Sequence, residues 1–347
     1  MRLGIVGRTA DGKDMFDGQT VSTRLWRDEL EKQFQGERNK VFVVDTYNYK
    51  KRVIPIMIQW IGCMFSCSHI VFMLSGNGLT FFLPLLYIAQ KFFGKRVYHR
   101  VIGGEIDIYI KQHPKSVKYF NSFEVNWVQS NKMIEKLEDV GVTNGQYMEN
   151  FRRITPVPKD EIKKTFEKPF RFCTFSRVSK TKGIDLAILA IDSVNRKAGG
   201  IVAMLDVYGP IEKEFETEFH SLLESHSNCV SYKGSIPSEK AVGILKDYDF
   251  HLFPTTWKGE GFPGTLIDCY NAGLPTIGST WAYNDEFIEE GKTGYLYDWK
   301  KPEELQNCIE KAIMNTDKMY DMRLNCLSEA SKYCSEVAMK KVMNAFC

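Results

Sequence analysis

Short runs of branched and aromatic residues alternate along the chain with longer segments in which apolar residues recur at helical spacing. In the first half, the runs that predict strands are Leu3–Val6, Val41–Val44, Ile70–Leu74, Arg96–Ile102 and Val125–Gln129. The segments that predict helices are Gln19–Phe34, Val53–Cys63, Leu79–Phe93 and Asn131–Val140. Alternation of this kind predicts a parallel sheet with helices on both faces.

The same alternation starts again in the second half. The predicted strands there are Phe170–Phe175, Val202–Val207, Cys229–Tyr232, Asp249–Phe253, Thr276–Ile277 and Tyr295–Tyr297. The predicted helices are Gly183–Arg196, Glu212–Ser225, Ser238–Leu245, Gly264–Asn271, Pro302–Met314 and Ser328–Phe346. A linker-like stretch, residues 151–169, carries three prolines among charged residues between the halves.

We therefore predict two Rossmann-like, doubly wound parallel-sheet domains facing a cleft. The first covers residues 1–160 and the second residues 161–327. The remaining residues, 328–347, are expected to form a C-terminal helix that packs back across the junction. Ligands of doubly wound sheets bind at the carboxyl ends of the strands, so the loops that follow strands are where chemistry is sought.

Composition narrows the class of protein. A length of 347 residues suits two domains, and 44% apolar with 26% charged residues is typical of a globular protein. A net charge of +3 gives no general case for nucleic-acid binding. Nine cysteines without metal-ligand spacing indicate free thiols in a reducing compartment. We expect no metal site, no secretion signal and no apolar run of the ~20 residues that a spanning helix needs, and hence a cytoplasmic protein.

A basic loop follows the predicted strand Phe170–Phe175 and runs from Ser176 to Gly183. Arg177 and Lys182 are five residues apart in this loop, close enough to converge on one anion, and the helix that follows adds N–H donors at its start. A guanidinium fork and an ammonium group suit the two phosphates of a diphosphate leaving group. The alternative is an ordinary solvated basic loop.

A glycine-rich loop follows the predicted strand Asp249–Phe253. Its sequence Gly259-Glu260-Gly261-Phe262-Pro263-Gly264 has the G-x-G-x-x-G spacing of a dinucleotide-binding turn. However, Thr255 to Lys258 separate the strand from the first glycine, and Gly278-Ser279-Thr280 offers no acid after the next strand. An NAD-dependent Rossmann enzyme is therefore the less favoured alternative.

Two acidic residues accompany this loop, Glu260 within it and Asp268 on the following helix, with seven residues between them. Carboxylates are suited to vicinal hydroxyls of a sugar or ribose, and the glycines beside Glu260 let a ligand approach the main chain. The stretch from Glu260 to Asp268, followed by Ala272-Gly273-Leu274-Pro275, resembles the E-x7-E signature of family-4 retaining glycosyltransferases, which have the GT-B fold. The loop from Ser176 to Gly183 looks like that family's diphosphate-binding segment.

The first half is similar to this family more loosely, through Asp17-Gly18-Gln19-Thr20, the segment Arg100–Glu105 and Asn150-Phe151. These segments resemble bacterial members that assemble capsule, exopolysaccharide or O-antigen. The resemblance implies transfer of a sugar from a nucleotide-diphosphate sugar, UDP-sugar favoured, to a saccharide or lipid-linked saccharide acceptor with retention. No cofactor is implied, because the nucleotide-sugar is a substrate.

The resemblance also implies roles for particular residues. Arg177 and Lys182 would neutralise the departing diphosphate, Glu260 would contact the donor sugar, and Asp268 would bind the ribose. The other donor-side positions carried over are Gly18, Ser176, Gly261, Phe262, Gly264 and Thr265. Two departures from the family pattern, Asp268 in place of Glu and Pro263 with no N–H to donate, keep a catalytically weak GT-B partner subunit as an alternative.

In the first half, His99 near the end of a predicted strand is a catalytic candidate by the same resemblance, with a half-buried structural histidine as the alternative. Arg100 and Glu105 are acceptor-side candidates, and Gly18 is either a donor-phosphate contact or part of an ordinary turn and cap. Basic residues around the apolar stretch Phe81–Phe93 predict peripheral association with the inner membrane surface, the alternative being solvated lysines over buried helices.

Overall fold

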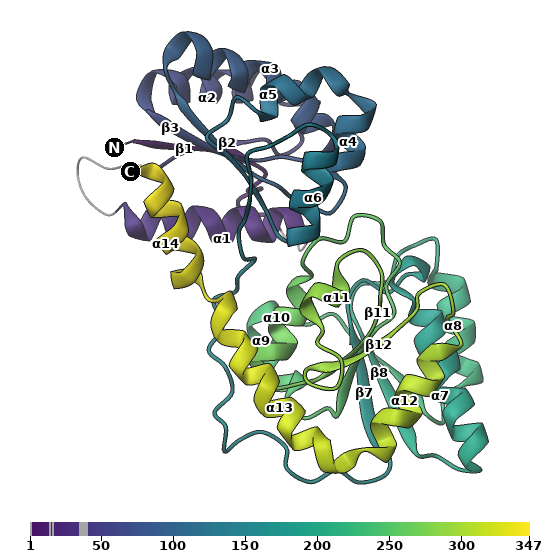
Figure 1. The fold of residues 1–347 in the computed structure, drawn as a ribbon. Coiled ribbons are helices and arrows are strands. Elements are labelled where there is room, and N and C mark those ends of the chain that lie inside the picture. The colour runs from purple at the N-terminus through teal and green to yellow at the C-terminus, as the bar shows by residue number, and fades with distance from the viewer. Residues whose placement is uncertain (1, 14, 16, 35–40) are drawn as a thin grey trace. The chain divides into compact units, whose positions relative to one another are not determined.

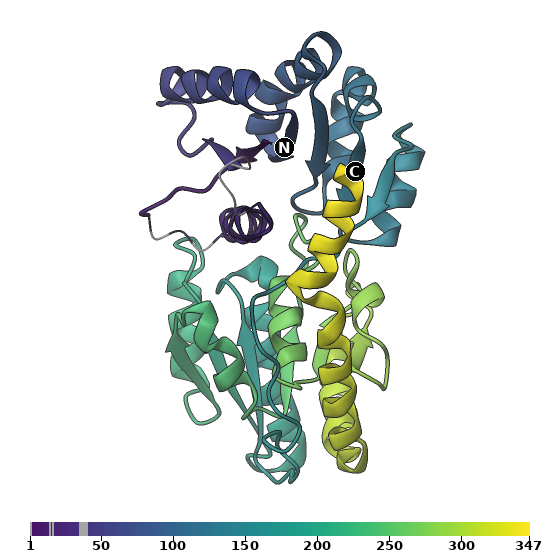
Figure 2. The same ribbon diagram turned by 90° about the vertical axis from the view of Figure 1, so that its left-hand side faces the viewer.

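A computed structural model of the chain describes residues 2–13, 15, 17–34 and 41–347. The chain divides into two compact units, one formed by Met1–Phe151 with Ser335–Cys347 and the other by Arg152–Cys334. Each unit holds a six-stranded sheet in which all neighbouring strands run parallel, with helices on both faces (Figures 1 and 2). The prediction of two Rossmann-like α/β domains is confirmed.

In the first unit the strand order is β2-β1-β3-β4-β5-β6. The strands are β1 (Leu3–Gly7), β2 (Val41–Asp45), β3 (His69–Met73), β4 (Arg96–Arg100), β5 (Val125–Val128) and β6 (Gly145–Tyr147). The helices are α1 (Gly18–Gln33), α2 (Val53–Ser66), α3 (Gly76–Phe93), α4 (Ile106–Gln112), α5 (Val117–Phe120), α6 (Asn131–Asp139) and α14 (Ser335–Phe346), with a 3-10 turn at Pro114–Ser116.

Side chains of successive strand residues point to opposite faces, and β1 shows which helices cover each face of the first sheet. Leu3 and Ile5 belong to one core cluster with Trp26 of α1 and Val342 of α14. Between them, Gly4 points the other way, where a Cβ atom would lie 2.3 Å from the Cys63 sulfur of α2. Helices α1 and α14 therefore cover one face, whereas α2 and α3 cover the other (Figure 1).

In the second unit the strand order is β12-β11-β10-β7-β8-β9. The strands are β7 (Phe170–Phe175), β8 (Ala203–Tyr208), β9 (Val230–Gly234), β10 (Phe250–Phe253), β11 (Thr276–Ser279) and β12 (Gly294–Tyr297). The helices are α7 (Ile184–Ala198), α8 (Glu216–Ser225), α9 (Ser238–Leu245), α10 (Gly264–Asn271), α11 (Asn284–Phe287), α12 (Glu304–Met314) and α13 (Thr316–Ala330), with 3-10 turns at Lys180–Lys182 and Ser331–Tyr333.

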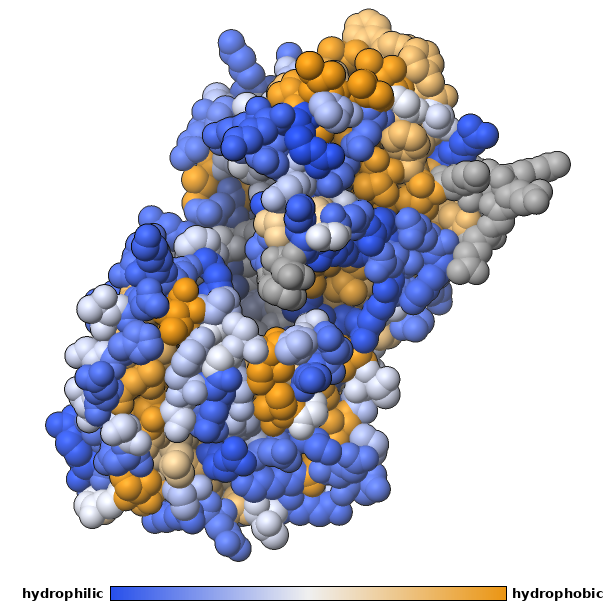
Figure 3. Space-filling model, turned by 180° about the vertical axis from the view of Figure 1, so that it is seen from behind, coloured by the Kyte–Doolittle hydropathy of each residue, from blue (hydrophilic) through white to orange (hydrophobic). Residues whose placement is uncertain are grey.

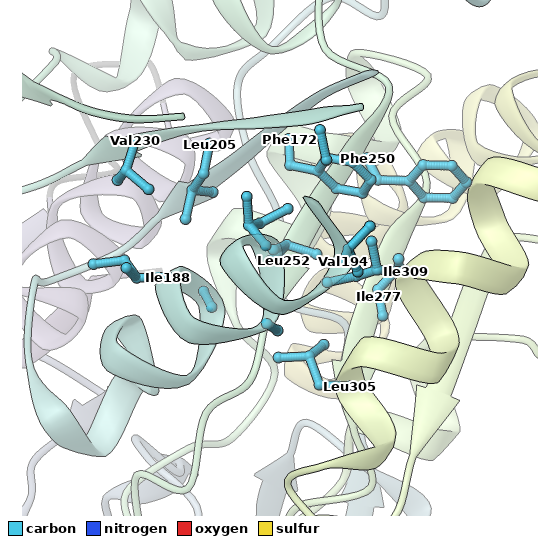
Figure 4. Packing of buried hydrophobic residues seen from close by; sticks show 14 of the residues in the cluster. Phe172, Ile188, Val194, Leu205, Val230, Phe250, Leu252, Ile277, Leu305 and Ile309 are labelled. Carbon is cyan, nitrogen blue, oxygen red and sulfur yellow. The ribbon is translucent and has the colours of Figure 1, made fainter. Parts of the chain in front are cut away.

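The second sheet has a core on each face. Phe172 of β7 belongs to a cluster with Ile188 of α7 and Leu305 of α12 (Figure 4). The next residue, Cys173, points to the other face and joins Leu245 of α9 in a second cluster. A core of buried strand residues on both faces holds the strand ends in place, and with them the loops that carry the candidate site.

The observed elements differ from the predicted ones in three ways. Strand β6 was not predicted, because Gly145-Gln146-Tyr147 is a short, largely polar edge strand. The helix expected over Ser328–Phe346 is interrupted, because Cys334 is extended and pairs with Arg152 as an isolated bridge, so α14 begins at Ser335. Four helices, α4, α5, α11 and α13, were also not predicted.

Across the part of the chain that the structure describes, every helix is too short or too polar to cross a bilayer.

Candidate active site

The loops that follow β7, β8 and β10 meet at one edge of the second sheet. Strand β7 lies between β10 and β8, and parallel strands bring the ends of all three to the same edge. The loops are joined by main-chain hydrogen bonds: Thr256 N donates to Thr181 O at 2.8 Å, and Val178 N to Pro210 O at 2.9 Å. The basic loop and the glycine-rich loop, far apart in the sequence, are therefore neighbours.

Gly183 makes the close approach of two of these loops possible. Its φ is +69°, which is a left-handed conformation, and an added Cβ atom would lie 2.3 Å from the carbonyl oxygen of Pro254. A larger residue would both strain the backbone and separate the loops. Glycine is thus required between the basic loop and α7.

Lys182 and Glu260 form a buried ion pair between the two loops. The Lys182 ammonium contacts Glu260 Oε2, and each side chain is only 10% exposed. Thr255 Oγ1 donates a second hydrogen bond to the same carboxylate oxygen at 3.0 Å. The Lys182 ammonium also lies 5.7 Å from the ring centroid of Phe253. A cation and a carboxylate in direct contact, both mostly buried, are therefore held at the carboxyl edge of the sheet.

Arg177 lies in the same loop and is more exposed. Its guanidinium pairs with Glu212, which follows β8, and lies 4.7 Å from the ring centroid of Trp257. The preceding Ser176 is held by the loop itself, since its N–H donates to Tyr208 O at 3.2 Å and its hydroxyl to Arg177 O at 3.1 Å. The structure therefore brings Arg177 and Lys182 into one loop cluster, each already paired with a carboxylate.

The segment from Gly261 to Thr265 turns from this loop into α10. Phe262 is buried and stacks on Phe287 with ring centroids 3.9 Å apart, so its side chain anchors the loop in the core. Gly264 begins α10, and Thr265 in the first turn has a buried hydroxyl without a hydrogen-bond partner among the described residues. Free hydrogen-bonding groups at a helix N-terminus favour anions.

Asp268 lies on α10 and is buried against a residue from outside the predicted site. Arg152 Nε lies 3.2 Å from Asp268 Oδ1. Burial raises the pKa of the Asp268 carboxyl, while the Arg152 charge and hydrogen bond act to lower it. The same guanidinium packs on Gly264, where an added Cβ atom would lie 1.8 Å from an Arg152 nitrogen. Arg152 therefore occupies the space beside the start of α10.

In the first unit, His99 and Arg100 end strand β4 and are both fully buried. His99 Nδ1 lies 2.9 Å from Asn126 Oδ1, and its ring stacks on Phe72 at 4.2 Å. Burial lowers the pKa of His99 to about 3, so the ring is neutral at physiological pH. Its Nε2 has no hydrogen-bond partner among the described residues, and the other contacts of the ring lie within the first unit.

Arg100 is a buried cation with few partners. Its Nη1 donates to Val101 O at 2.9 Å, and its guanidinium lies 5.5 Å from the ring centroid of Trp26. Nε and Nη2 have no hydrogen-bond partner among the described residues, and burial lowers the pKa of Arg100 to about 10. Donors of a charged side chain that are buried without a hydrogen-bond partner are unusual.

The other two candidates of the first unit are exposed. Glu105 precedes α4 and makes no capping hydrogen bond there. Gly18 begins α1 with open space around its Cα, and Asp17 caps the helix by accepting from Thr20 N at 3.2 Å. An open pocket of about 480 Å³ lies at the carboxyl ends of β1 and β2. Its lining residues include Ala10, Asp11, Asp45, Tyr47, Arg52 and Gln59.

Sequence reasoning missed the partners of the predicted residues: Thr255, Glu212, Trp257 and Arg152. Thr255 and Trp257 lie in the loop that follows β10, and their position directly after a buried strand could have indicated a place in the site. Glu212 and Arg152 had no such signal, because their contacts depend on loops brought together by the fold. Within the described ranges, no group of three or more His, Cys, Asp or Glu side chains is arranged to hold a metal ion.

Among known proteins, a family model matches most of the second unit. Residues 158–330 match the model of the family described as glycosyl transferases group 1. An uncharacterized glycosyltransferase of Methanocaldococcus jannaschii is 24% identical over 240 residues, 67% of this chain and 55% of that protein. The amylovoran biosynthesis glycosyltransferase AmsK of Erwinia amylovora is 25% identical over 39% of this chain and 34% of its own length. The chain thus spans about half or less of these relatives.

Solved structures extend the likeness to the whole chain. Anabaena HepE, whose crystal structure holds UDP-glucose, superimposes with a TM-score of 0.72 over 99% of both chains, at 15% identity. At this identity the likeness shows the fold, which is GT-B. Together with the family match and the relatives, it supports a glycosyltransferase of the GT-B type.

Proposed function

We propose that this GT-B protein, whose residues 158–330 match glycosyl transferases group 1, moves a sugar from a UDP-sugar to a saccharide or lipid-linked saccharide acceptor with retention of configuration. The observation that carries the proposal is the buried contact between Lys182 and Glu260. It joins the two loops that were assigned to the diphosphate and to the donor sugar, at the edge of the sheet where such folds bind ligands.

The donor site is proposed to act by charge compensation. Lys182 and Arg177 would bind the two phosphates, and the N-terminus of α10 with the Thr265 hydroxyl would add hydrogen bonds to them. Glu260 would accept hydrogen bonds from the hydroxyls of the donor sugar, with Thr255 fixing its orientation. The two cations and the donors at the start of α10 stabilise the anion that forms as the diphosphate departs, and this stabilisation is the main catalytic contribution.

The bond between the anomeric carbon and the β-phosphate oxygen breaks, and the acceptor hydroxyl oxygen bonds to the same carbon from the same face. The proton of the acceptor hydroxyl passes to the departing phosphate oxygen. No covalent intermediate on the enzyme and no cofactor are needed, and we propose that Arg177 and Lys182 supply the positive charge without a metal ion.

Two ion pairs must open for the donor to bind. Without ligand, Arg177 is paired with Glu212 and Lys182 with Glu260, so the positive charge of the loop cluster is neutralised. A diphosphate that carries more than one negative charge offers both cations a stronger partner. Glu212 and the diphosphate therefore compete for Arg177, and Glu260 becomes available to the sugar when Lys182 turns to the phosphate.

The acceptor is assigned to the first unit. Arg100 is fully buried, whereas Glu105 is exposed and makes no capping hydrogen bond, so Glu105 is the group of this pair that an acceptor hydroxyl reaches. The pocket beside Asp45 and Arg52 offers further polar groups at the carboxyl edge of this sheet. We propose that these groups hold the acceptor of a surface-polysaccharide pathway such as capsule, exopolysaccharide or O-antigen assembly.

The test is UDP release from a panel of UDP-sugars, with and without oligosaccharide acceptors, in buffer that contains EDTA. We expect slow hydrolysis of one donor without acceptor and faster release with one, together with an α-linked product from an α-linked donor by NMR. Glu260→Gln should lose transfer while it still binds UDP. A product of inverted configuration, or full transfer by Glu260→Gln, would contradict the mechanism.

One contact favours a second candidate, a catalytically weak partner subunit. Arg152 already pairs with Asp268, the residue assigned to the ribose. If Arg152 keeps that carboxylate when nucleotide is present, the donor loses a contact. Binding of UDP without turnover of any UDP-sugar would favour this candidate, and copurification with a second glycosyltransferase chain would identify its partner.

A further inference from the structure

Helix α2 exposes an apolar stripe to solvent. Ile54, Ile58, Ile61 and Phe65 are spaced by four, three and four residues, which places them on one side of the helix. Their exposed fractions are 75%, 65%, 51% and 81%. Side chains of this size are seldom so exposed in a row, because each keeps its apolar surface in contact with water.

Helix α3 continues this surface. Its exposed apolar residues are Phe81, Ile88, Phe92 and Phe93, with Phe92 at 78%. The two helices pack together through Trp60 and Phe82, whose ring centroids lie 5.8 Å apart. Hydrophobic side chains gather over the top of the first unit in Figure 3, where α2 and α3 lie in Figure 1. We call the eight exposed side chains named above the α2–α3 face.

The charge of this part of the chain is one-sided. Between Asp45 and Glu105 the sequence contains no acidic residue. It contains seven basic ones: Lys50, Lys51, Arg52, Lys91, Lys95, Arg96 and Arg100. Lys50 and Lys51 are exposed just before α2, and Lys91 is exposed in the last turn of α3. Arg52 pairs with Asp45 at 3.6 Å and Arg96 with Glu124 at 3.3 Å, so the charge beside the apolar face is carried by Lys50, Lys51 and Lys91, which lie near the ends of α2 and α3.

We propose that the α2–α3 face docks on an anionic lipid bilayer, with its apolar side chains at the boundary of the acyl chains and its lysines against the headgroups. Neither helix is able to span a bilayer, so the contact is interfacial. The charge pattern favours a bilayer over a second copy of the chain as the partner of this face. In a two-fold dimer the same patch meets itself, and the lysines that flank it would face one another without acidic partners.

This docking deepens the proposed function, because it brings the unit assigned to the acceptor to the surface where lipid-linked saccharides lie. The binding itself does not depend on transferase activity. It is therefore tested without nucleotide or acceptor, and either claim can fail alone.

The experiment is sedimentation of the full chain with vesicles, either of phosphatidylcholine alone or with phosphatidylglycerol. We expect tighter binding to the anionic vesicles, weakened by salt. Ile58→Gln with Phe65→Gln should lower the partition coefficient about tenfold or more, since burial of each apolar side chain favours the bilayer. Lys50→Gln with Lys51→Gln should lower it by about tenfold or more on anionic vesicles only.

The matched control is Met314→Gln in the second unit, where Met314 is 77% exposed, close to Phe65 at 81%. This variant should bind vesicles as the wild type does. Equal vesicle binding by the α2 variant and the wild type would overturn the proposal, as would no binding by the wild type. Sedimentation velocity provides a further check, because a dimer abolished by Ile58→Gln with Phe65→Gln would assign the face to a second copy instead.

Discussion

The ion pair between Lys182 and Glu260 allows structural and functional contributions to be separated in one set of variants. Lys182→Met keeps the apolar stem beside Phe253 and removes the charge, and Glu260→Gln keeps an oxygen that accepts from Thr255. Because each side chain is only 10% exposed, either change alone leaves a buried charge without its partner. Such a loss costs about 3–5 kcal/mol of unfolding free energy.

The double variant should behave differently in stability and in binding. With both charges removed, no buried charge is left unpaired, so most of the unfolding free energy lost in the single variants should return. Binding of UDP should not return, because the cation that meets the diphosphate is absent. A hydrogen bond to a charged group contributes about 1.5–3 kcal/mol, which corresponds to UDP binding weaker by about 10- to 150-fold.

Urea unfolding followed by tryptophan fluorescence measures the first quantity, and titration calorimetry with UDP measures the second. We expect Lys182→Met to be unstable and deficient in binding, Glu260→Gln to be unstable but able to bind, and the double variant to be stable but deficient. A double variant as unstable as the single ones would refute the charge argument in favour of packing. Unchanged UDP affinity in Lys182→Met would refute the diphosphate assignment.

Three further predictions follow from other contacts. Arg177→Ala should cost about 2–4 kcal/mol of transition-state stabilisation, measured as a lower kcat/KM. Glu212→Gln should tighten UDP binding by at most about fivefold, since exposed ion pairs contribute up to ~1 kcal/mol. Weaker UDP binding by Glu212→Gln in calorimetry would contradict the proposed competition. Asp268→Ala should leave the Arg152 charge unpaired and lower the unfolding free energy by about 3 kcal/mol. Arg152→Ala should keep UDP binding. A loss of UDP binding in Arg152→Ala would make Arg152 part of the donor site. Burial lowers the pKa of His251 to about 3. As pH falls below about 6.5, the unfolded state therefore binds a proton that the folded state does not, and stability is lost from there down to about pH 3. Between pH 7 and pH 5 the unfolding free energy should fall by about 2 kcal/mol, and the same fall in a His251→Leu variant in urea unfolding would argue against His251 as its cause.

The sheets were predictable because their strands are buried on both faces and read as apolar runs. Eleven of the twelve strands were predicted, and β6 was not, since an edge strand of Gly145-Gln146-Tyr147 has no such run. The interruption of the C-terminal helix at Cys334 could not be predicted from neighbouring residues either, because it depends on a bridge to Arg152, which is far away in the sequence.

The same limit applies to the candidate site. Loop positions after strands pointed to Arg177, Lys182 and Glu260, and the structure brings Lys182 and Glu260 into contact. The carboxylate that holds Arg177 and the guanidinium that holds Asp268 come from other segments, and no pattern in the sequence links them. Sequence spacing therefore identified which residues carry charge near the site, and only the fold showed with which partners those charges are balanced.

The central claim is that the loops after β7 and β10 bind a uridine diphosphate, and titration calorimetry with UDP, GDP and NAD in the presence of EDTA tests it most directly. The account predicts binding of UDP in preference to the other two, undiminished by EDTA and weakened in Lys182→Met. Preference for NAD, or UDP binding that survives the loss of Lys182 unchanged, would contradict it.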